Sequence, residues 1–229
     1  MNLGHAYRSP VMWRTHYDTL RNKWRMEFVL TNLFYLAIVT CLVLLLIHCE
    51  KRIGFLSSQE KDLEDFKKKE AIYSILRSKG ISLNQGVDIA NAIIGQSRTL
   101  DIPVSLILAV MKKESAFNPY AVSSRNALGL MQIHPVTWKE YAEKLKLNGS
   151  PSAAFDPVTN VVVATHIIKE LYDSYKKTAL SESDLWESVL SAYYAGRTSL
   201  AQTGFQPSHR KYVADVNRYK REFEKIFSE

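Results

Sequence analysis

The hydrophobic pattern contains one long apolar run near the N-terminus. Residues 28–47 read FVLTNLFYLAIVTCLVLLLI, which is twenty residues without a charged side chain. An α-helix rises about 1.5 Å per residue, so this run reaches about 30 Å, the thickness of the hydrocarbon layer of a bilayer. A buried core helix of this length would usually carry a polar stripe. The pattern therefore predicts one transmembrane helix over residues 28–48.

Two other interpretations of this run stay open. A cleaved signal peptide normally has about 7–15 apolar residues behind a short charged region, whereas about 27 residues precede the longer run here. A lipid-modified cysteine would require cleavage before Cys41 or Cys49, but Thr40 and His48 stand where such sites favour a very small residue. A retained anchor fits the pattern better than either.

Charge dominates residues 49–82, which follow the apolar run. The block EKDLEDFKKKE precedes Ile72, Ile75 and Leu76, which are at helical spacing. This pattern predicts a helical juxtamembrane stalk, with a disordered charged linker as the alternative. Lys79 and Gly80 form a helix stop signal, so a separate domain is expected to cover residues 83–229.

Helical periodicity continues through residues 83–229. Val87, Ala90 and Ile94 share one face of a first helix, and the stretch PVSLILAVM from Pro103 is apolar nearly all round, as expected for a central buried helix. Further helices are predicted at 135–147, 157–177, 183–195 and 207–227. Three of these open with a proline, whose fixed φ suits the first helical turn. No sustained alternation of apolar and polar residues indicates a strand, so the predicted fold class is mainly α.

The net charge of +7 does not point to nucleic acid. Residues 1–83 contain 13 of the 30 basic residues and 8 of the 23 acidic residues. Residues 84–229 contain the remaining 17 basic and 15 acidic residues. The positive excess is therefore concentrated beside the apolar run, where a solvated flank and attraction to lipid headgroups explain it. The C-terminal part shows no basic stripe with interleaved aromatic residues, so no nucleic-acid partner is expected.

Glu114 ends the apolar stripe of the predicted central helix. Ile107, Val110 and Met111 lead to it at helical spacing. Apolar neighbours and the negative end of the helix dipole both favour the protonated carboxyl, which would suit a proton donor. Position alone favours an ordinary exposed glutamate at a frayed helix end, so the assignment depends on the residues that follow.

Six motifs follow in order along the chain. They are ESAFNP at 114–119, AVS at 121–123, ALGLMQ at 127–132 with Pro135 and Thr137, Asp156-Pro157 with Asn160-Val161, AYYAG at 192–196, and Tyr212-Val213 with Val216. This succession, over about residues 87–219, resembles the catalytic domain of the soluble lytic transglycosylase family. The resemblance implies a goose-type lysozyme-like helical fold with at most a very small β element, and it makes Glu114 the catalytic residue.

The sequence departs from the family pattern at two positions. Asn126 stands in place of a glycine, which is a tolerable change because asparagine adopts positive φ more readily than most residues. Tyr194 replaces the asparagine of the family motif A-Y-N-A-G. Any polar contact made by that asparagine is therefore not carried over to this chain.

The matched motifs supply further candidates for sugar binding, each of which also has a structural interpretation. The candidates are Ser123, Gly129, Met131, Gln132, Tyr193 and Tyr212. Serine and glutamine offer hydrogen bonds, methionine an adaptable apolar surface, and tyrosine a ring face with a hydroxyl. The glycine lets the backbone approach a ligand or adopt a turn closed to other residues. Alternatively, the serine caps a turn, the glycine serves packing, and the tyrosines belong to the core.

No second acid lies in a matching motif. Asp156 is expected to cap the helix that starts at Pro157, and Asp101 to favour the N-terminal dipole of the central helix. The resemblance implies that Glu114 alone protonates the bond between N-acetylmuramic acid and N-acetylglucosamine. It then acts as a base on the 6-hydroxyl of the muramic acid, which gives a 1,6-anhydro product. No cofactor is implied, and no metal site is predicted because three histidines lack partners at ligand spacing, namely His134, His166 and His209.

Two rival functions stay open: a hydrolytic muramidase on the same fold, and an inactive membrane-anchored module that binds glycan or acts as a scaffold. Peptidoglycan strands are the expected partner, and a cell-envelope-spanning machine is a further context that the sequence leaves open. Because peptidoglycan lies outside the cytoplasmic membrane, residues 1–27 are expected in the cytoplasm. The catalytic domain is then periplasmic, held at the inner membrane by a single span. The charges beside the span give only a slight bias toward this orientation.

Overall fold

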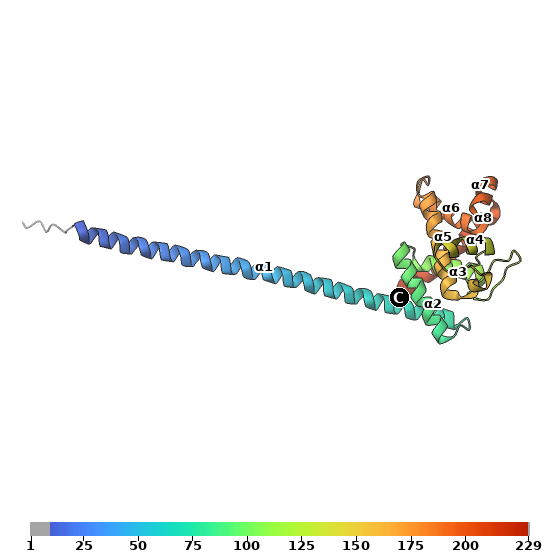
Figure 1. Ribbon diagram of the computed structural model, residues 1–229, viewed down its shortest axis with the longest axis horizontal. Coiled ribbons are helices and arrows are strands. Elements are labelled where there is room, and N and C mark those ends of the chain that lie inside the picture. The colour runs from blue at the N-terminus through green and yellow to red at the C-terminus, as the bar shows by residue number, and fades with distance from the viewer. Residues whose placement is uncertain (1–9, 229) are drawn as a thin grey trace, which may run out of the picture. The chain divides into compact units, whose positions relative to one another are not determined.

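A computed structural model describes residues 10–228, which belong to two compact units, Met1–Asp62 and Leu63–Glu229. The chain is mainly helical within the described range (Figure 1). In order, the elements are α1 (Pro10–Arg77), α2 (Leu83–Leu100), α3 (Val104–Ser115), α4 (Pro135–Lys144), the 3-10 helix η1 (Pro151–Phe155), α5 (Pro157–Tyr175), α6 (Glu182–Ala195), α7 (Arg197–Thr203) and α8 (Pro207–Ser228).

The N-terminal unit consists of the first part of α1. All of its described side chains are exposed, including the apolar residues of 28–47. By length and composition alone, helix α1 is long and apolar enough to cross a membrane. An uncharged apolar run with no protein surface against it would be unfavourable in water, because each exposed apolar side chain forgoes about 1.5–3 kcal/mol of burial.

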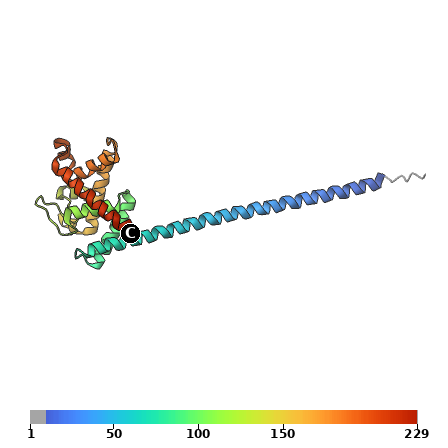
Figure 2. The same ribbon diagram turned by 180° about the vertical axis from the view of Figure 1, so that it is seen from behind.

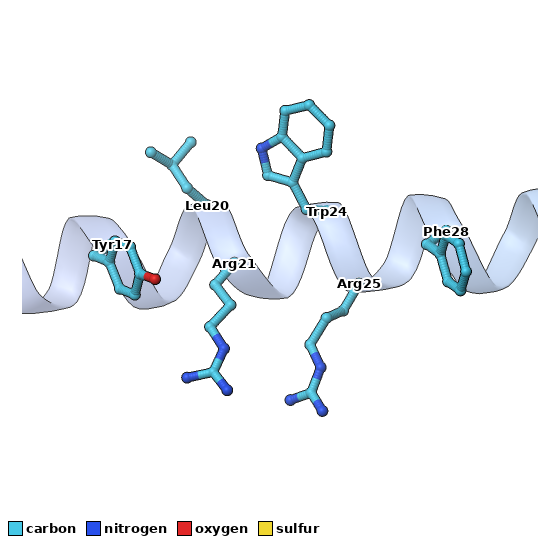
Figure 3. A pocket seen from close by; sticks show the side chains of 6 residues that line it. All are labelled: Tyr17, Leu20, Arg21, Trp24, Arg25 and Phe28. Atoms are coloured by element: carbon cyan, nitrogen blue, oxygen red, sulfur yellow. The ribbon is translucent and has the colours of Figure 1, made fainter.

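Aromatic and cationic side chains share a shallow hollow at the N-terminal end of this run. Figure 3 shows Arg21 and Arg25 pointing to one side of α1, with Leu20 and Trp24 on the other. Trp24 is 70% exposed. Tryptophan and arginine at the end of an apolar helix are typical of the interface between lipid headgroups and hydrocarbon.

The C-terminal unit includes the end of α1. Ile72 and Leu76 are fully buried in its core, and Asp65 pairs with Arg98 of α2. Gly86 of α2 allows the two helices to approach closely, since a Cβ at this position would lie 2.9 Å from the ring of Tyr73. The compact unit therefore starts at Leu63, earlier in the chain than the domain start expected near residue 83.

Helix α3 is the centre of the C-terminal unit. Its residues 105–111 are all buried, as the continuous apolar pattern predicted. It packs along α8, which crosses the unit in the view of Figure 2, while α5 packs against α2 and α6. Because α8 must cover α3, its own buried residues recur at helical spacing, at Tyr212, Val213, Val216 and Phe223.

Proline and capping residues define the helix starts as the sequence predicted. Helices α4, α5 and α8 all begin on a proline. Asp156 caps α5, since its Oδ1 accepts a hydrogen bond of 2.8 Å from the backbone N–H of Thr159. Asp101 has φ 55° and is the C-cap residue of α2, a role that was not predicted from the sequence, and its effect on the dipole of α3 stays a prediction.

Two short helices, η1 and α7, were not predicted from the sequence. The β content of the described residues is limited to the isolated bridges Val122–Leu128 and Leu128–Ile133. These bridges fold the segment between α3 and α4 into a compact loop. The predicted mainly α class with a very small β element is confirmed.

Candidate active site

Glu114 lies in the last turn of α3, where the buried helix reaches a cleft. The helix ends because Ala116 and Phe117 both adopt positive φ, at 51° and 69°. Such backbone conformations are costly for residues other than glycine unless the surroundings enforce them. Here Phe117 is buried and packs edge-on against Phe223 of α8 at 6.2 Å. This contact fixes the turn that presents the Glu114 carboxyl.

Tyr212 of α8 is the hydrogen-bond partner of Glu114. Its hydroxyl donates to Glu114 Oε1 at 2.5 Å, and its side chain is almost fully buried. The two neighbouring lysines are engaged elsewhere: Lys113 pairs with Asp215 at 2.7 Å and Lys112 with Glu222 at 2.7 Å. The Glu114 carboxyl therefore faces a neutral phenol and has no ion-pair partner among the described residues.

Burial raises the pKa of Glu114 from 4.5 to about 7, although the Tyr212 hydrogen bond and the charge of Lys113 both lower it. The carboxyl is thus divided between its two protonation states near neutral pH. A group with this pKa can give a proton in one step and take one back in the next. The direction agrees with the sequence argument from desolvation.

A cleft of about 740 Å³ opens over Glu114. It is lined by the loop 123–127, by side chains around α4, by Ile167 and Leu171 of α5, and by the segment 192–198. Of the predicted binding residues, Ser123, Gln132 and Tyr193 lie on its lining.

Ser123 and Gln132 also hold the loop that forms one wall. Ser123 Oγ accepts hydrogen bonds from the backbone N–H groups of Arg125 and Ala127, at 3.2 and 3.0 Å. Gln132 Nε2 donates to the carbonyls of Ala121 and Gly129, both at 3.0 Å. The turn-capping interpretation of Ser123 is therefore the one that its contacts support, while its position on the cleft is compatible with binding.

Asn126, which stands where the family has glycine, has a φ of 60° in the same loop. This is the left-handed region that asparagine tolerates better than most residues. The expectation that asparagine can serve at this position is thus supported by the backbone.

Gly129 and Met131 are buried beneath the cleft rather than on it. Gly129 has a φ of 79°, and a Cβ there would lie 2.4 Å from both the Ala154 carbonyl oxygen and Asn160 Nδ2. Only glycine fits this position. Their contacts therefore support a structural role for both residues, in place of the direct sugar contact that the motif suggested.

Asn160 belongs to one of the family motifs, but the sequence analysis assigned it no role, and the structure shows it beneath the site. It is fully buried, and its amide makes three hydrogen bonds: it accepts from Met131 N at 2.8 Å and donates to the carbonyls of Ala154 and Leu128 at 2.8 and 3.1 Å. It thereby ties α5 to the floor of the cleft. Its place in a family motif and its position before the apolar run 161–164 were the available signals, because a buried amide must be satisfied.

Tyr193 joins α6 to the same floor. Its hydroxyl donates to the Met131 carbonyl at 2.8 Å. Burial and the nearby Glu114 carboxylate raise the pKa of Tyr193, and the same two causes raise that of Tyr212, well above the ordinary value. Both phenols therefore stay protonated and act as hydrogen-bond donors at any physiological pH.

A second carboxylate, Glu140, lines the cleft from α4. It pairs with Lys144 at 2.8 Å, and Lys144 also contacts Glu170 at 3.1 Å, which in turn accepts from Arg197 at 2.9 Å. Burial raises the pKa of Glu170, but hydrogen bonds from Arg197, Lys144 and Tyr141 outweigh it and lower the pKa to about 2. Glu140 belongs to no family motif quoted above, so sequence reasoning did not single it out.

Among the described residues, no group of three or more histidine, cysteine, aspartate or glutamate side chains could hold a metal ion. His134 instead caps α4, where its Nδ1 accepts from Val136 N at 3.4 Å, and His166 Nδ1 lies 2.8 Å from the Val162 carbonyl.

Comparison with known proteins identifies the domain. A family model described as "Transglycosylase SLT domain" matches residues 91–215. The chain is 34% identical over 129 residues to membrane-bound lytic murein transglycosylase C of Mannheimia succiniciproducens, covering 55% of this chain and 36% of that protein. It is 37% identical over 120 residues to the protein of that name from Photorhabdus laumondii, covering 51% and 33%.

The chain thus spans about a third of the length of these curated relatives. Among solved structures, the 70-kDa soluble lytic transglycosylase in complex with bulgecin A matches with a TM-score of 0.51 and 25% identity, over 61% of this chain and 24% of that one. The predicted lysozyme-like helical fold is confirmed by this match. Because the family model covers more than half of its residues, this chain belongs to the transglycosylase SLT domain family.

Proposed function

We propose that the protein is a membrane-anchored peptidoglycan lytic transglycosylase in which Glu114 is the catalytic acid and base. The observation that carries the proposal is the Glu114 carboxyl at the base of the cleft, bonded to Tyr212 and with its pKa raised to about 7. The names of the relatives, which are lytic murein transglycosylases, support the same substrate class.

In the proposed first step, protonated Glu114 donates to the glycosidic oxygen between N-acetylmuramic acid and N-acetylglucosamine. The bond from that oxygen to the anomeric carbon of the muramic acid breaks, and N-acetylglucosamine leaves with the protonated oxygen as its 4-hydroxyl. The acetamide of the substrate stabilises the cationic sugar. In the second step the Glu114 carboxylate removes the proton from the 6-hydroxyl, whose oxygen closes onto the anomeric carbon. Because the nucleophile belongs to the same sugar, proximity replaces a second carboxylate that would hold water.

Tyr212 is proposed to orient Glu114, while Ser123, Gln132 and Tyr193 border the bound glycan. Gly129 and Met131 are assigned to the floor of the cleft because both residues are buried. The test is to incubate purified sacculi with the full chain in detergent and to measure the masses of the released muropeptides. Muropeptides that lack one water, together with loss of product in the Glu114→Gln chain, are expected.

Hydrolysis is the second candidate because Glu140 offers another carboxylate in the same cleft. If Glu140 held a water for hydrolysis, products would carry reducing ends and Glu140→Gln would abolish their release. For the transglycosylase, products keep the 1,6-anhydro end in the Glu140→Gln chain. Glu143→Gln, which changes an exposed residue of the same helix, is the matched control.

We further propose that residues 28–48 hold the protein in the inner membrane with a single span and place residues 63–229 in the periplasm. The charges support this orientation only slightly, because Arg14, Arg21, Lys23 and Arg25 precede the span while Lys51, Arg52 and Lys61 follow it. The stronger support is the proposed substrate, since peptidoglycan lies outside the cytoplasmic membrane. A C-terminal alkaline phosphatase fusion should be active in cells, since that reporter requires export. Activity of a cytoplasm-dependent reporter at the same position would reverse the orientation.

A further inference from the structure

Tyr194 stands out on the lining of the cleft because it is a large aromatic side chain left 40% exposed. The hydroxyls of the two neighbouring tyrosines already have hydrogen-bond partners in the protein: Tyr193 donates to the Met131 carbonyl and Tyr212 to Glu114. The exposed part of the ring offers apolar surface to a ligand in the cleft, and covering such surface is worth about 25 cal/mol per Å².

The ring of Tyr194 is held in place from behind. One face stacks on Tyr212, with centroids 4.7 Å apart and an interplanar angle of 25°. His209 meets it edge-on at 5.9 Å and 71°. His209 is itself buried, and its Nδ1 accepts from Gln206 N at 3.2 Å. The start of α8 thus fixes the orientation of the Tyr194 ring before any ligand arrives.

A fixed aromatic ring beside a catalytic carboxyl suits a pyranose. A sugar ring has an apolar face of C–H groups and a polar rim of hydroxyls, and tyrosine offers an apolar face with a polar hydroxyl. Because stacking on Tyr212 already restricts the side chain, little conformational entropy is lost on binding. The asparagine found here in the family motif could offer hydrogen bonds but no such face.

We propose that Tyr194 is an aromatic platform on which one sugar ring of the glycan rests next to Glu114. This inference rests on the proposed function for its substrate class, and it assigns a binding role to the one position where the motif A-Y-N-A-G is altered. Tyr194 stacks on Tyr212, and Tyr212 donates its hydrogen bond to Glu114. A sugar resting on the free face of Tyr194 is therefore separated from Tyr212 by the thickness of one ring.

Binding is tested in the full chain carrying Glu114→Gln, in detergent, so that no turnover occurs. The probe is a set of uncross-linked four-sugar glycan fragments prepared from sacculi, and Kd is measured by calorimetry. Tyr194→Ala and Tyr194→Asn are expected to raise Kd at least about tenfold, whereas Tyr194→Phe, which keeps the ring, stays within about threefold. Tyr120→Ala, at an exposed tyrosine outside the cleft lining, is the matched control and leaves Kd unchanged.

Circular dichroism and Tm of each variant guard against misfolding, and the Phe and Asn variants keep the test decisive if Tyr194→Ala unfolds. The proposal is overturned if the Ala or Asn variant binds within twofold of the Glu114→Gln chain, or if Phe loses as much affinity as Ala. In the active chain, the same variants should raise KM more than they lower kcat. Loss of kcat alone, with a displaced pH profile, would mean that the ring acts only through Tyr212 and would also overturn it.

The two proposals fail separately. If the unsubstituted chain releases no 1,6-anhydro product but Tyr194→Ala still weakens glycan binding, the proposed function is wrong and the platform stands. If the unsubstituted chain cleaves sacculi and Tyr194→Ala binds normally, only the platform is wrong.

Discussion

Removing the hydroxyl of Tyr212 is the sharpest test of how the site sets the protonation of Glu114. In Tyr212→Phe the ring remains, so its packing against α3 and its stacking with Tyr194 are preserved. The variant deletes only the hydrogen bond to Glu114 Oε1. That bond favours the ionised carboxylate and opposes the effect of burial. Its removal should therefore raise the pKa of Glu114 further.

The magnitude follows from general energetics. A hydrogen bond to a charged group contributes about 1.5–3 kcal/mol, and one pKa unit corresponds to about 1.4 kcal/mol. The pKa should rise from about 7 to between about 8 and 9. Because the protonated carboxyl is the donor in the first step, the alkaline limb of the kcat/KM profile moves to higher pH by the same amount.

The assay is the release of 1,6-anhydro product from soluble glycan strands, measured from pH 5 to about pH 10. Tyr219→Phe is the control, since Tyr219 lies on the same helix, under Lys112, and its hydroxyl is not bonded to Glu114. An alkaline limb that stays in place, or moves to lower pH, in Tyr212→Phe would refute the argument that the phenol stabilises the carboxylate.

Three further predictions concern stability. The folded pKa of Glu114, about 7, exceeds its ordinary 4.5, so the folded chain binds this proton more tightly and loses stability as pH rises from about 4.5 to 7. Glu114→Gln should therefore be more stable than wild type by up to about 3 kcal/mol at pH 8 and equal to it at pH 4, and thermal melts at both pH values would expose a wrong sign. Gly129→Ala should lower the free energy of unfolding by more than about 3 kcal/mol, because the added Cβ meets the Ala154 backbone and the Asn160 amide. The control is Gly149→Ala, whose Cβ has open space and which should change that free energy by less than about 1 kcal/mol. Similar urea midpoints for the two variants would contradict the close packing. Asn160→Ala leaves one N–H and two carbonyls of the cleft floor without their partner. The loss should lower the free energy of unfolding by about 3 kcal/mol or more and should also lower kcat/KM. An unchanged urea midpoint would show that these hydrogen bonds contribute little.

The exposed surface of α1 gives a reason to study the whole chain. Its apolar run is exposed in the described part of the N-terminal unit, which is unfavourable in water, so we propose to keep the full chain in detergent. Because Ile72 and Leu76 of the same helix are buried in the C-terminal unit, a soluble fragment starting near residue 80 would lose part of its core. A fragment that begins at Leu63 preserves those contacts.

The sequence alone determined the features that depend on local pattern. The twenty-residue apolar run, the helices α2 to α6 and α8, and the proline starts of α4, α5 and α8 all followed from periodicity and capping. These signals express the preferences of residues within one or two turns. The position of Glu114 at the end of a buried stripe was also visible, as was the tolerance of Asn126 for positive φ. The ordered motifs supplied the family.

Only the tertiary structure decided how distant residues meet. Tyr212 is separated from Glu114 by 98 positions and reaches it only because α8 packs along α3. The same packing stacks Tyr194 on Tyr212, while the fold of the loop before α4 places Gly129 and Met131 under the cleft. Glu140 entered the site because α4 borders it. Such contacts depend on how whole helices pack, and no short-range pattern specifies which faces will be brought together.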